Sequence, residues 1–163
     1  MELWSNACRK KLIPPESVIQ KVKEIRSQKA TIATLNGSFD LMHAGHLQII
    51  YEASLQADIL IVALNSDSSI QAYKSRDRPI IPLEYRIQLM AALEFVDYVT
   101  WFDETDPLRL LNEIKPDVHA NGAEYGENCI EADLVKENGG RIHIVRLIPG
   151  LSTSSILKKI ASL

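Results

Sequence analysis

Residues 59–64 read ILIVAL, so a strand formed by this segment would be apolar on both faces. Such strands are typical of the centre of a parallel sheet, because helices cover that kind of sheet on both sides. Four more strand-like segments alternate with helical patterns along the chain: they are residues 31–35, 96–102, 117–120 and 141–147. The alternation predicts an α/β fold, with a doubly wound five-stranded parallel sheet and helices on both faces.

The segments between the predicted strands carry recognisable helix ends. Pro15 stands where a first helical turn would begin, and a second helix is expected to start near His43. A third helix is expected over residues 83–93. The last helix is expected to begin at residues 152–155 and to run to the C-terminus.

The length of 163 residues suits a single domain. We expect an N-terminal tail and helix over residues 1–29 and a Rossmann-like core over residues 30–163. The 18 basic and 21 acidic residues give a net charge of -3, which argues against nucleic acid as the main partner. The two cysteines form no CxxC pair, no apolar leader is seen and the apolar runs are short. These features predict a cytoplasmic protein without membrane contact.

One polar segment follows the first predicted strand directly: residues 36–46 read NGSFDLMHAGH. Gly37 permits a tight turn, and the spacing of His43 and His46 would place both on one face of a helix. They would lie in its first turn, where free backbone N–H groups and the helix dipole favour anions. Gly45 would let a ligand approach the backbone closely. The residues alone predict a phosphate site, with a zinc site and a surface helix start without a role as alternatives.

This segment resembles the signature of the HxGH nucleotidyltransferases, the cytidylyltransferase-like superfamily. The resemblance covers roughly residues 15–160. Further matching blocks are Leu64-Asn65-Ser66-Asp67, Lys74 with Arg78-Pro79, Leu83-Glu84-Tyr85-Arg86, Lys115-Pro116-Asp117 and Gly150-Leu151-Ser152-Thr153-Ser154. Within the superfamily, the chain is most similar to the D-glycero-β-D-manno-heptose 1-phosphate adenylyltransferases, which occur alone or as the C-terminal half of a bifunctional heptose kinase/adenylyltransferase.

The resemblance implies transfer of AMP from ATP to a sugar 1-phosphate, with release of pyrophosphate, in lipopolysaccharide core biosynthesis. It also implies a homodimer and a Mg²⁺ ion that arrives with the triphosphate, without a metal site built by the protein alone. In-line attack of a substrate phosphate on the α-phosphorus requires donors that stabilise charge rather than a protein nucleophile.

The resemblance gives catalytic roles to His43, His46 and Lys74. A second set would bind the nucleotide or its phosphates and comprises Asn36, Gly37, Ser38, Phe39, Gly45, Arg86, Gly122, Ser152, Thr153 and Ser154. A third set would contact the phosphorylated acceptor and comprises Asp40, Asn65, Asp67, Arg78, Glu124 and Tyr125.

Several of these residues have structural alternatives. For Lys74 the alternative is a solvated lysine, and for Arg86 it is an ion pair with a neighbour on its own helix. For Asp67 and for the cluster Ser152-Thr153-Ser154, the alternative is that they only cap helices. For Asp40, the alternative is that it holds the turn or orients His43 instead of contacting a ligand.

The chain departs from the heptose enzymes after the fourth predicted strand. Those enzymes usually carry Lys-Gly-x-Asp-Tyr there, whereas this chain reads Asn121-Gly122-Ala123-Glu124-Tyr125. The loss of the lysine charge weakens the expectation of a heptose phosphate more than that of nucleotidyl transfer. Two alternatives stay open: a CTP-dependent cytidylyltransferase acting on glycerol 3-phosphate or phosphoethanolamine, and a nucleotide-binding sensor without turnover.

Overall fold

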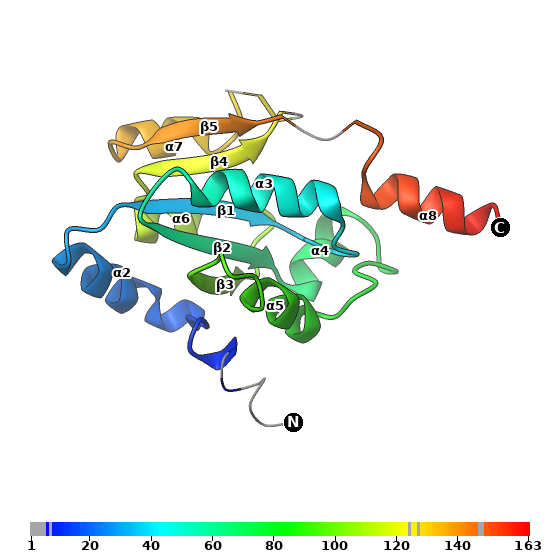
Figure 1. Ribbon diagram of the computed structural model, residues 1–163, viewed down its shortest axis with the longest axis horizontal. Coiled ribbons are helices and arrows are strands. Elements are labelled where there is room, and N and C mark those ends of the chain that lie inside the picture. The colour runs from blue at the N-terminus through cyan, green and yellow to red at the C-terminus, as the bar shows by residue number, and fades with distance from the viewer. Residues whose placement is uncertain (1–5, 7, 124, 127, 147–148) are drawn as a thin grey trace.

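The computed structural model describes residues 6, 8–123, 125–126, 128–146 and 149–163. Five parallel strands form one sheet in the order β3-β2-β1-β4-β5 (Figure 1). Their bounds are Ile32–Gly37 for β1, Ile59–Asn65 for β2, Tyr98–Phe102 for β3, Val118–Gly122 for β4 and Arg141–Val145 for β5. The predicted Rossmann-like sheet is therefore confirmed.

Helices cover both faces of this sheet (Figure 1). Their bounds are Pro15–Ser17 for the 3-10 turn η1, Val18–Ser27 for α2, Ala44–Ser54 for α3, Asp67–Tyr73 for α4, Leu83–Ala91 for α5, Leu108–Ile114 for α6, Ala132–Glu137 for α7 and Thr153–Ala161 for α8. On one face, α3 and α5 bury Ile50 and Met90, whereas α2 and α6 bury Val22 and Ile114 on the other. Each such side chain contributes about 1.5–3 kcal/mol on burial, so both layers hold the strand ends in place.

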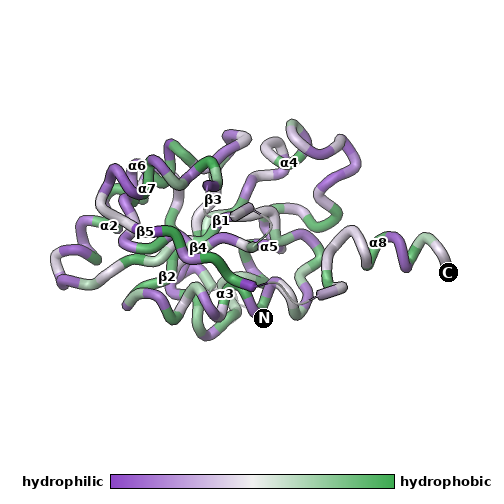
Figure 2. Tube along the Cα trace, turned by 90° about the horizontal axis from the view of Figure 1, so that it is seen from above, coloured by the Kyte–Doolittle hydropathy of each residue, from purple (hydrophilic) through white to green (hydrophobic). Residues whose placement is uncertain are grey.

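The last helix, α8, differs from the helices that flank the sheet. Figures 1 and 2 show it projecting from the body of the fold, and none of its residues is buried. Ser152 is its N-cap, because Ser152 Oγ accepts a hydrogen bond from Ser155 N at 3.1 Å. The helix therefore begins where the sequence predicts. Within the described residues, no helix combines the length and the apolar character that crossing a membrane requires.

Some element ends differ from the sequence predictions by one or two residues. β3 begins at Tyr98 rather than at residue 96, because residues 94–95 form a turn and residues 96–97 lead out of it; Asp97 Oδ2 accepts a hydrogen bond from Leu60 N. α3 begins at Ala44, so His43 is its N-cap rather than part of its first turn. Helix and strand ends commonly vary by this much, and the elements themselves are as predicted.

The strand order places β1 between β2 and β4. The chain therefore leaves β1 toward one edge of the sheet and later returns to the other side of β1. At such a switch point, the connections after the two neighbouring strands diverge and leave a crevice, where doubly wound sheets bind ligands. The fold thus brings the segments after β1 and β4 to one place.

Candidate active site

A pocket of about 240 Å³ opens at the carboxyl ends of β1 and β4. Its walls come from the loop after β1, the start of α3, the end of α4, the end of β4 and the segment before α8. Its lining residues are Leu35, Asn36, Gly37, Ser38, Phe39, His43, Gly45, His46, Ile49, Lys74, Asn121, Gly122, Tyr125, Leu151, Ser152 and Thr153. Most of the residues that the sequence assigned to the site are therefore brought together.

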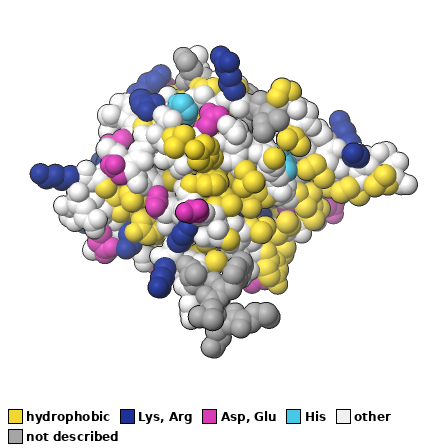
Figure 3. Space-filling view, in the orientation of Figure 1, with side chains coloured by type: hydrophobic (Ala, Val, Ile, Leu, Met, Phe, Trp, Pro, Cys, Tyr) yellow, Lys and Arg dark blue, Asp and Glu magenta, His cyan; other side chains and the backbone are white. Residues whose placement is uncertain are grey.

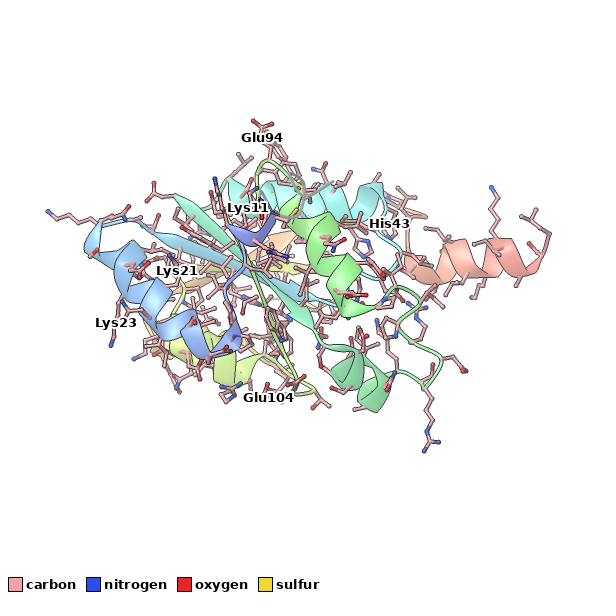
Figure 4. All side chains as sticks on the ribbon, turned by 90° about the horizontal axis from the view of Figure 1, so that it is seen from below. Lys11, Lys21, Lys23, His43, Glu94 and Glu104 are labelled. Carbon is pink, nitrogen blue, oxygen red and sulfur yellow. The ribbon has the colours of Figure 1, made fainter. Side chains whose placement is uncertain are left out.

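His43 and His46 stack at the start of α3, with ring centroids 4.0 Å apart. His43 Nδ1 accepts a hydrogen bond from Gly45 N at 3.1 Å, and His46 Nδ1 accepts one from His43 N at 3.4 Å. Backbone N–H groups can only donate, so the proton of each neutral ring lies on Nε2. Both imidazoles are thereby fixed as Nε2–H donors. Figure 4 shows His43 at the start of α3, in the space between α5 and α8.

Both imidazoles are held in the neutral form. Burial lowers the pKa of His43. Burial also lowers the pKa of His46 to about 4, and the proximity of His43 and Lys74 acts in the same direction. His43 Nε2 is itself buried and has no hydrogen-bond partner among the described residues. Because buried donors are normally paired, this N–H is available to a ligand oxygen.

Two glycines make room for the aromatic rings of the site. A Cβ on Gly45 would lie 2.9 Å from His43 Cε1 and 3.6 Å from Leu151 Cβ. A Cβ on Gly37 would lie 3.1 Å from Phe39 Cε2. A side chain at Gly45 would therefore displace the imidazole of His43, which explains why the residue directly before His46 is glycine.

Lys74 enters the pocket as the C-cap of α4. Its Nζ donates a hydrogen bond to Ser38 Oγ at 3.1 Å, which ties the end of α4 to the loop after β1. Burial lowers the pKa of Lys74, and the nearby positive charge of Arg78 acts in the same direction. An anionic ligand would relieve both effects.

The start of α8 contributes two of its three predicted residues. Ser152 and Thr153 line the pocket, whereas Ser154 is exposed and lies outside the lining. Thr153 Oγ1 donates a hydrogen bond to Asp40 O at 2.9 Å, so this wall is fastened to the loop after β1. Ser152 caps the helix and lines the pocket at the same time.

Arg86, which was predicted to bind phosphate, is not among the residues that line the pocket. Its side chain is buried, and its Nε donates to Ile81 O at 2.9 Å. Its Nη1 donates to Ser38 O at 2.7 Å and to Asn65 O at 2.9 Å, and its Nη2 pairs with Asp67 Oδ1 at 2.7 Å. Asn65 and Asp67, which were predicted to contact the acceptor, lie in the same framework and do not line the pocket. A buried guanidinium needs such acceptors, so this group holds the ends of β1 and β2 together.

Asp40 and Arg78 also lie behind the pocket rather than in its lining. The Asp40 side chain is fully buried, and its two oxygens accept hydrogen bonds from Ile80 N and Ile81 N, each at 2.9 Å. Arg78 Nη2 pairs with Asp40 Oδ2 at 2.7 Å. Both residues were predicted to contact the acceptor. The structure instead uses them to fasten the loop after α4 to the loop after β1.

The end of β4 supplies a neutral wall. Asn121 and Gly122 line the pocket, and Tyr125 follows them. Asn121 Nδ2 donates a hydrogen bond to Glu131 Oε2 at 3.3 Å, and both side chains are buried. Glu124, the other predicted acceptor contact on this segment, lies outside the described residues.

Four lining residues carried no site assignment from the sequence: Leu35, Ile49, Asn121 and Leu151. Ile49 lies three residues after His46 on α3, so helical spacing could have found it. Leu35 precedes the polar loop directly. Leu151 lies within the matching block at residues 150–154 but was given no role in the site, and it lines the pocket directly before α8 begins.

Within the described part of the chain, no cluster of three or more His, Cys, Asp and Glu side chains is placed to hold a metal ion. Among the described residues, the pocket lining offers hydroxyl and carboxamide oxygens but no carboxylate. Hard divalent cations prefer carboxylates and phosphates. Any such ion in this pocket would therefore need ligands that a nucleotide brings.

The family model described as cytidylyltransferase-like matches residues 34–159, which include every pocket-lining residue. The chain belongs to the cytidylyltransferase-like family. Family relatives include the bifunctional protein HldE of Methylobacillus flagellatus, which is 41% identical over 148 residues, or 90% of this chain and 30% of that protein. HldE of Campylobacter concisus is 41% identical over 145 residues, with 87% and 30% covered. The chain thus spans about 30% of the length of these relatives.

Solved structures of similar proteins agree with this family assignment. A lipopolysaccharide core biosynthesis protein from Thermoplasma volcanium superposes with a TM-score of 0.58 at 29% identity, covering 73% of this chain and 97% of that one. Pantoate-beta-alanine ligase from Francisella tularensis gives a TM-score of 0.63 at 21% identity, covering 86% and 70%. The second likeness shows a shared fold.

Proposed function

We propose that this chain transfers AMP from ATP to a sugar 1-phosphate, D-glycero-β-D-manno-heptose 1-phosphate, giving an ADP-sugar and pyrophosphate. The observation that carries the proposal is the pair of neutral Nε2–H donors on His43 and His46, in one pocket with Lys74. The similarity to HldE proteins supports ATP and a heptose phosphate as the substrates.

In the proposed reaction, an oxygen of the acceptor phosphate attacks the α-phosphorus and the bond to pyrophosphate breaks in line. Nε2–H of His43 and of His46 donates to oxygens of the transferring group, and neutral rings do so without losing a proton. Lys74 Nζ leaves Ser38 Oγ for a phosphate oxygen. Donors placed in this way typically contribute about 3–4 kcal/mol each to the transition state.

The start of α8 suits the β- and γ-phosphates, because Ser152 and Thr153 line the pocket and helix N-termini favour anions. Mg²⁺ bound to the triphosphate would supply further charge neutralisation. Since the described lining residues include no carboxylate, its ligands would be phosphate oxygens and water.

The test is a matrix of nucleotides and acceptors. Purified chain with Mg²⁺ is incubated with ATP or CTP against heptose 1-phosphate, glycerol 3-phosphate and phosphoethanolamine, and pyrophosphate release is followed. We expect turnover with ATP and heptose 1-phosphate. Turnover with CTP alone would establish the cytidylyltransferase alternative, and tight nucleotide binding without any turnover would establish the sensor.

We also propose that the chain forms a homodimer through an apolar face. A groove between α3, α5 and α8 shares His43 with the pocket, and Figure 3 shows hydrophobic side chains gathered over α3 and α5 and continuing toward α8. Leu89 on α5 and Ile160 on α8 are exposed. A helix of 9 residues such as α8 is only marginally stable without packing partners. A second copy of the chain would supply such packing by burying Leu89 and Ile160.

Sedimentation at micromolar concentration tests this assembly. We expect a dimer for the wild type and a monomer for Leu89→Glu. The control is Ile19→Glu, an exposed position on α2 at the opposite face of the sheet. A monomeric wild type would refute the dimer.

A further inference from the structure

The wall at the end of β4 is built on three buried side chains. Asn121, Cys129 and Glu131 are 4%, 8% and 6% exposed. Asn121 Nδ2 donates to Glu131 Oε2 at 3.3 Å. Cys129 lies beside both, and its thiol forms hydrogen bonds with Asn121 and with Glu131. Burial raises the pKa of this thiol. Of the three side chains, only Asn121 lines the pocket.

Glu131 determines which end of the Asn121 carboxamide meets the ligand. A carboxylate accepts hydrogen bonds and cannot donate them, so it takes the NH₂ end of Asn121. The Oδ1 end is then the one left for the pocket. The terminal torsion of asparagine has two broad, nearly equivalent orientations. Without an acceptor-only neighbour, the carboxamide would therefore be free to present its NH₂ group instead.

The neighbouring strand carries a second carboxamide at the same level. Leu35 pairs with Ala120 in the parallel register, so Asn36 and Asn121 follow on adjacent strands. Asn36 also lines the pocket, and its Oδ1 is buried without a hydrogen-bond partner among the described residues. An amide oxygen repels phosphate oxygens, since both only accept hydrogen bonds. This wall therefore suits the part of a ligand that carries O–H or N–H groups.

We propose that Glu131 is a positioning residue that fixes Asn121 Oδ1 as the acceptor for a hydroxyl or amino group on the non-phosphate part of a substrate. The inference rests on the proposed function for the identity of the pocket's ligands. Two sources supply such a donor: the exocyclic amino group of the nucleobase and a hydroxyl of the acceptor sugar. Phosphates are left to His43, His46, Lys74 and the start of α8.

Glu131→Gln tests this role, because glutamine has nearly the same size but offers both a donor and an acceptor to Asn121. The dissociation constants of ATP, of ITP, which has a carbonyl in place of the adenine amino group, and of heptose 1-phosphate are measured by calorimetry. With two nearly equivalent orientations, about half of the molecules keep Oδ1 toward the pocket, so we expect one ligand to bind about twofold more weakly, with an unchanged thermal midpoint. The matched control is Glu137→Gln, at an exposed position in the last turn of α7, the helix whose N-cap is Glu131.

The pattern of loss identifies the source of the donor. Weaker binding of ATP but not of ITP assigns Asn121 Oδ1 to the base, and weaker binding of heptose 1-phosphate alone assigns it to the sugar. Asn121→Ser should show the same selective loss, and Glu131→Gln should add nothing to it, because Glu131 acts through Asn121.

The positioning role is overturned if all three dissociation constants stay within measurement error of the wild-type values, or if binding of all three ligands weakens and the thermal midpoint falls together. It is also overturned if the two substitutions are additive. Because binding is measured without turnover, a chain that binds these ligands but releases no pyrophosphate refutes the proposed function and leaves this test intact.

Discussion

Replacing Arg86 by methionine distinguishes a framework residue from a phosphate contact. Methionine keeps most of the apolar stem but removes the donors to Ile81 O, Ser38 O and Asn65 O, and the partner of Asp67. Removing one member of a buried ion pair costs about 3–5 kcal/mol. The Asp67 side chain is 40% exposed and can be rehydrated, so we expect the lower end, about 3 kcal/mol. In a domain of this size that corresponds to a thermal midpoint about 6–12 °C lower.

The assay is urea unfolding followed by circular dichroism, together with ATP binding well below the unfolding transition. The control is Arg109→Met, whose side chain is 56% exposed and pairs with Glu104 and Glu113. An exposed pair of this kind contributes only a few tenths of a kcal/mol. We expect Arg86→Met to be much less stable than the control and to bind ATP nearly as well as the wild type. Wild-type stability with lost ATP affinity would show that Arg86 contacts phosphate after all.

The remaining predictions concern stability in acid and two residues of the pocket. Burial lowers the pKa of His119 from 6.5 to about 4. As the pH falls, the unfolded chain binds this proton first, so the free energy of unfolding decreases by about 3 kcal/mol between pH 6.5 and pH 4. Urea titrations should show a smaller pH slope for His119→Gln, and equal slopes would contradict this cause. Gly45→Ala should lower kcat about a hundredfold, because its Cβ would displace the imidazole of His43; an unchanged kcat would show that the ring position is not critical. Lys74→Met should reduce kcat by about two orders of magnitude with an unchanged thermal midpoint, whereas a wild-type rate would identify Lys74 as a solvated lysine.

The elements that are coded locally could be predicted from the sequence. The apolar run at residues 59–64 forms β2, and the contiguous segment at residues 36–46 supplies the loop and both imidazoles. Ser152 caps α8 where the Ser/Thr cluster begins. In each case, one short stretch of chain contains both the signal and the structure that it produces.

The roles of Arg86 and Glu131 depend on partners that are distant in the sequence or on orientation, and no motif distinguishes them. An arginine on the first turns of a helix has the same local sequence whether it faces a ligand or the carbonyl of Ser38, 48 positions away. Glu131 lies ten positions from Asn121 across a loop, and only the fold brings the two side chains together. Such contacts follow from packing, which local patterns do not encode.

The buried Asp40 joins the start of α8, one wall of the pocket, to the loop that follows the α4 wall, and without it the two walls would open separately. Its carboxylate holds Ile80 N and Ile81 N in the loop after α4, and its carbonyl holds Thr153 at the start of α8. Local opening in proteins occurs in cooperative units, and these contacts make one unit of both walls. A ligand that orders one wall therefore spares the next ligand part of the entropic cost of ordering the other. Two substrates, one bound at each of these walls, would show positive cooperativity without touching each other.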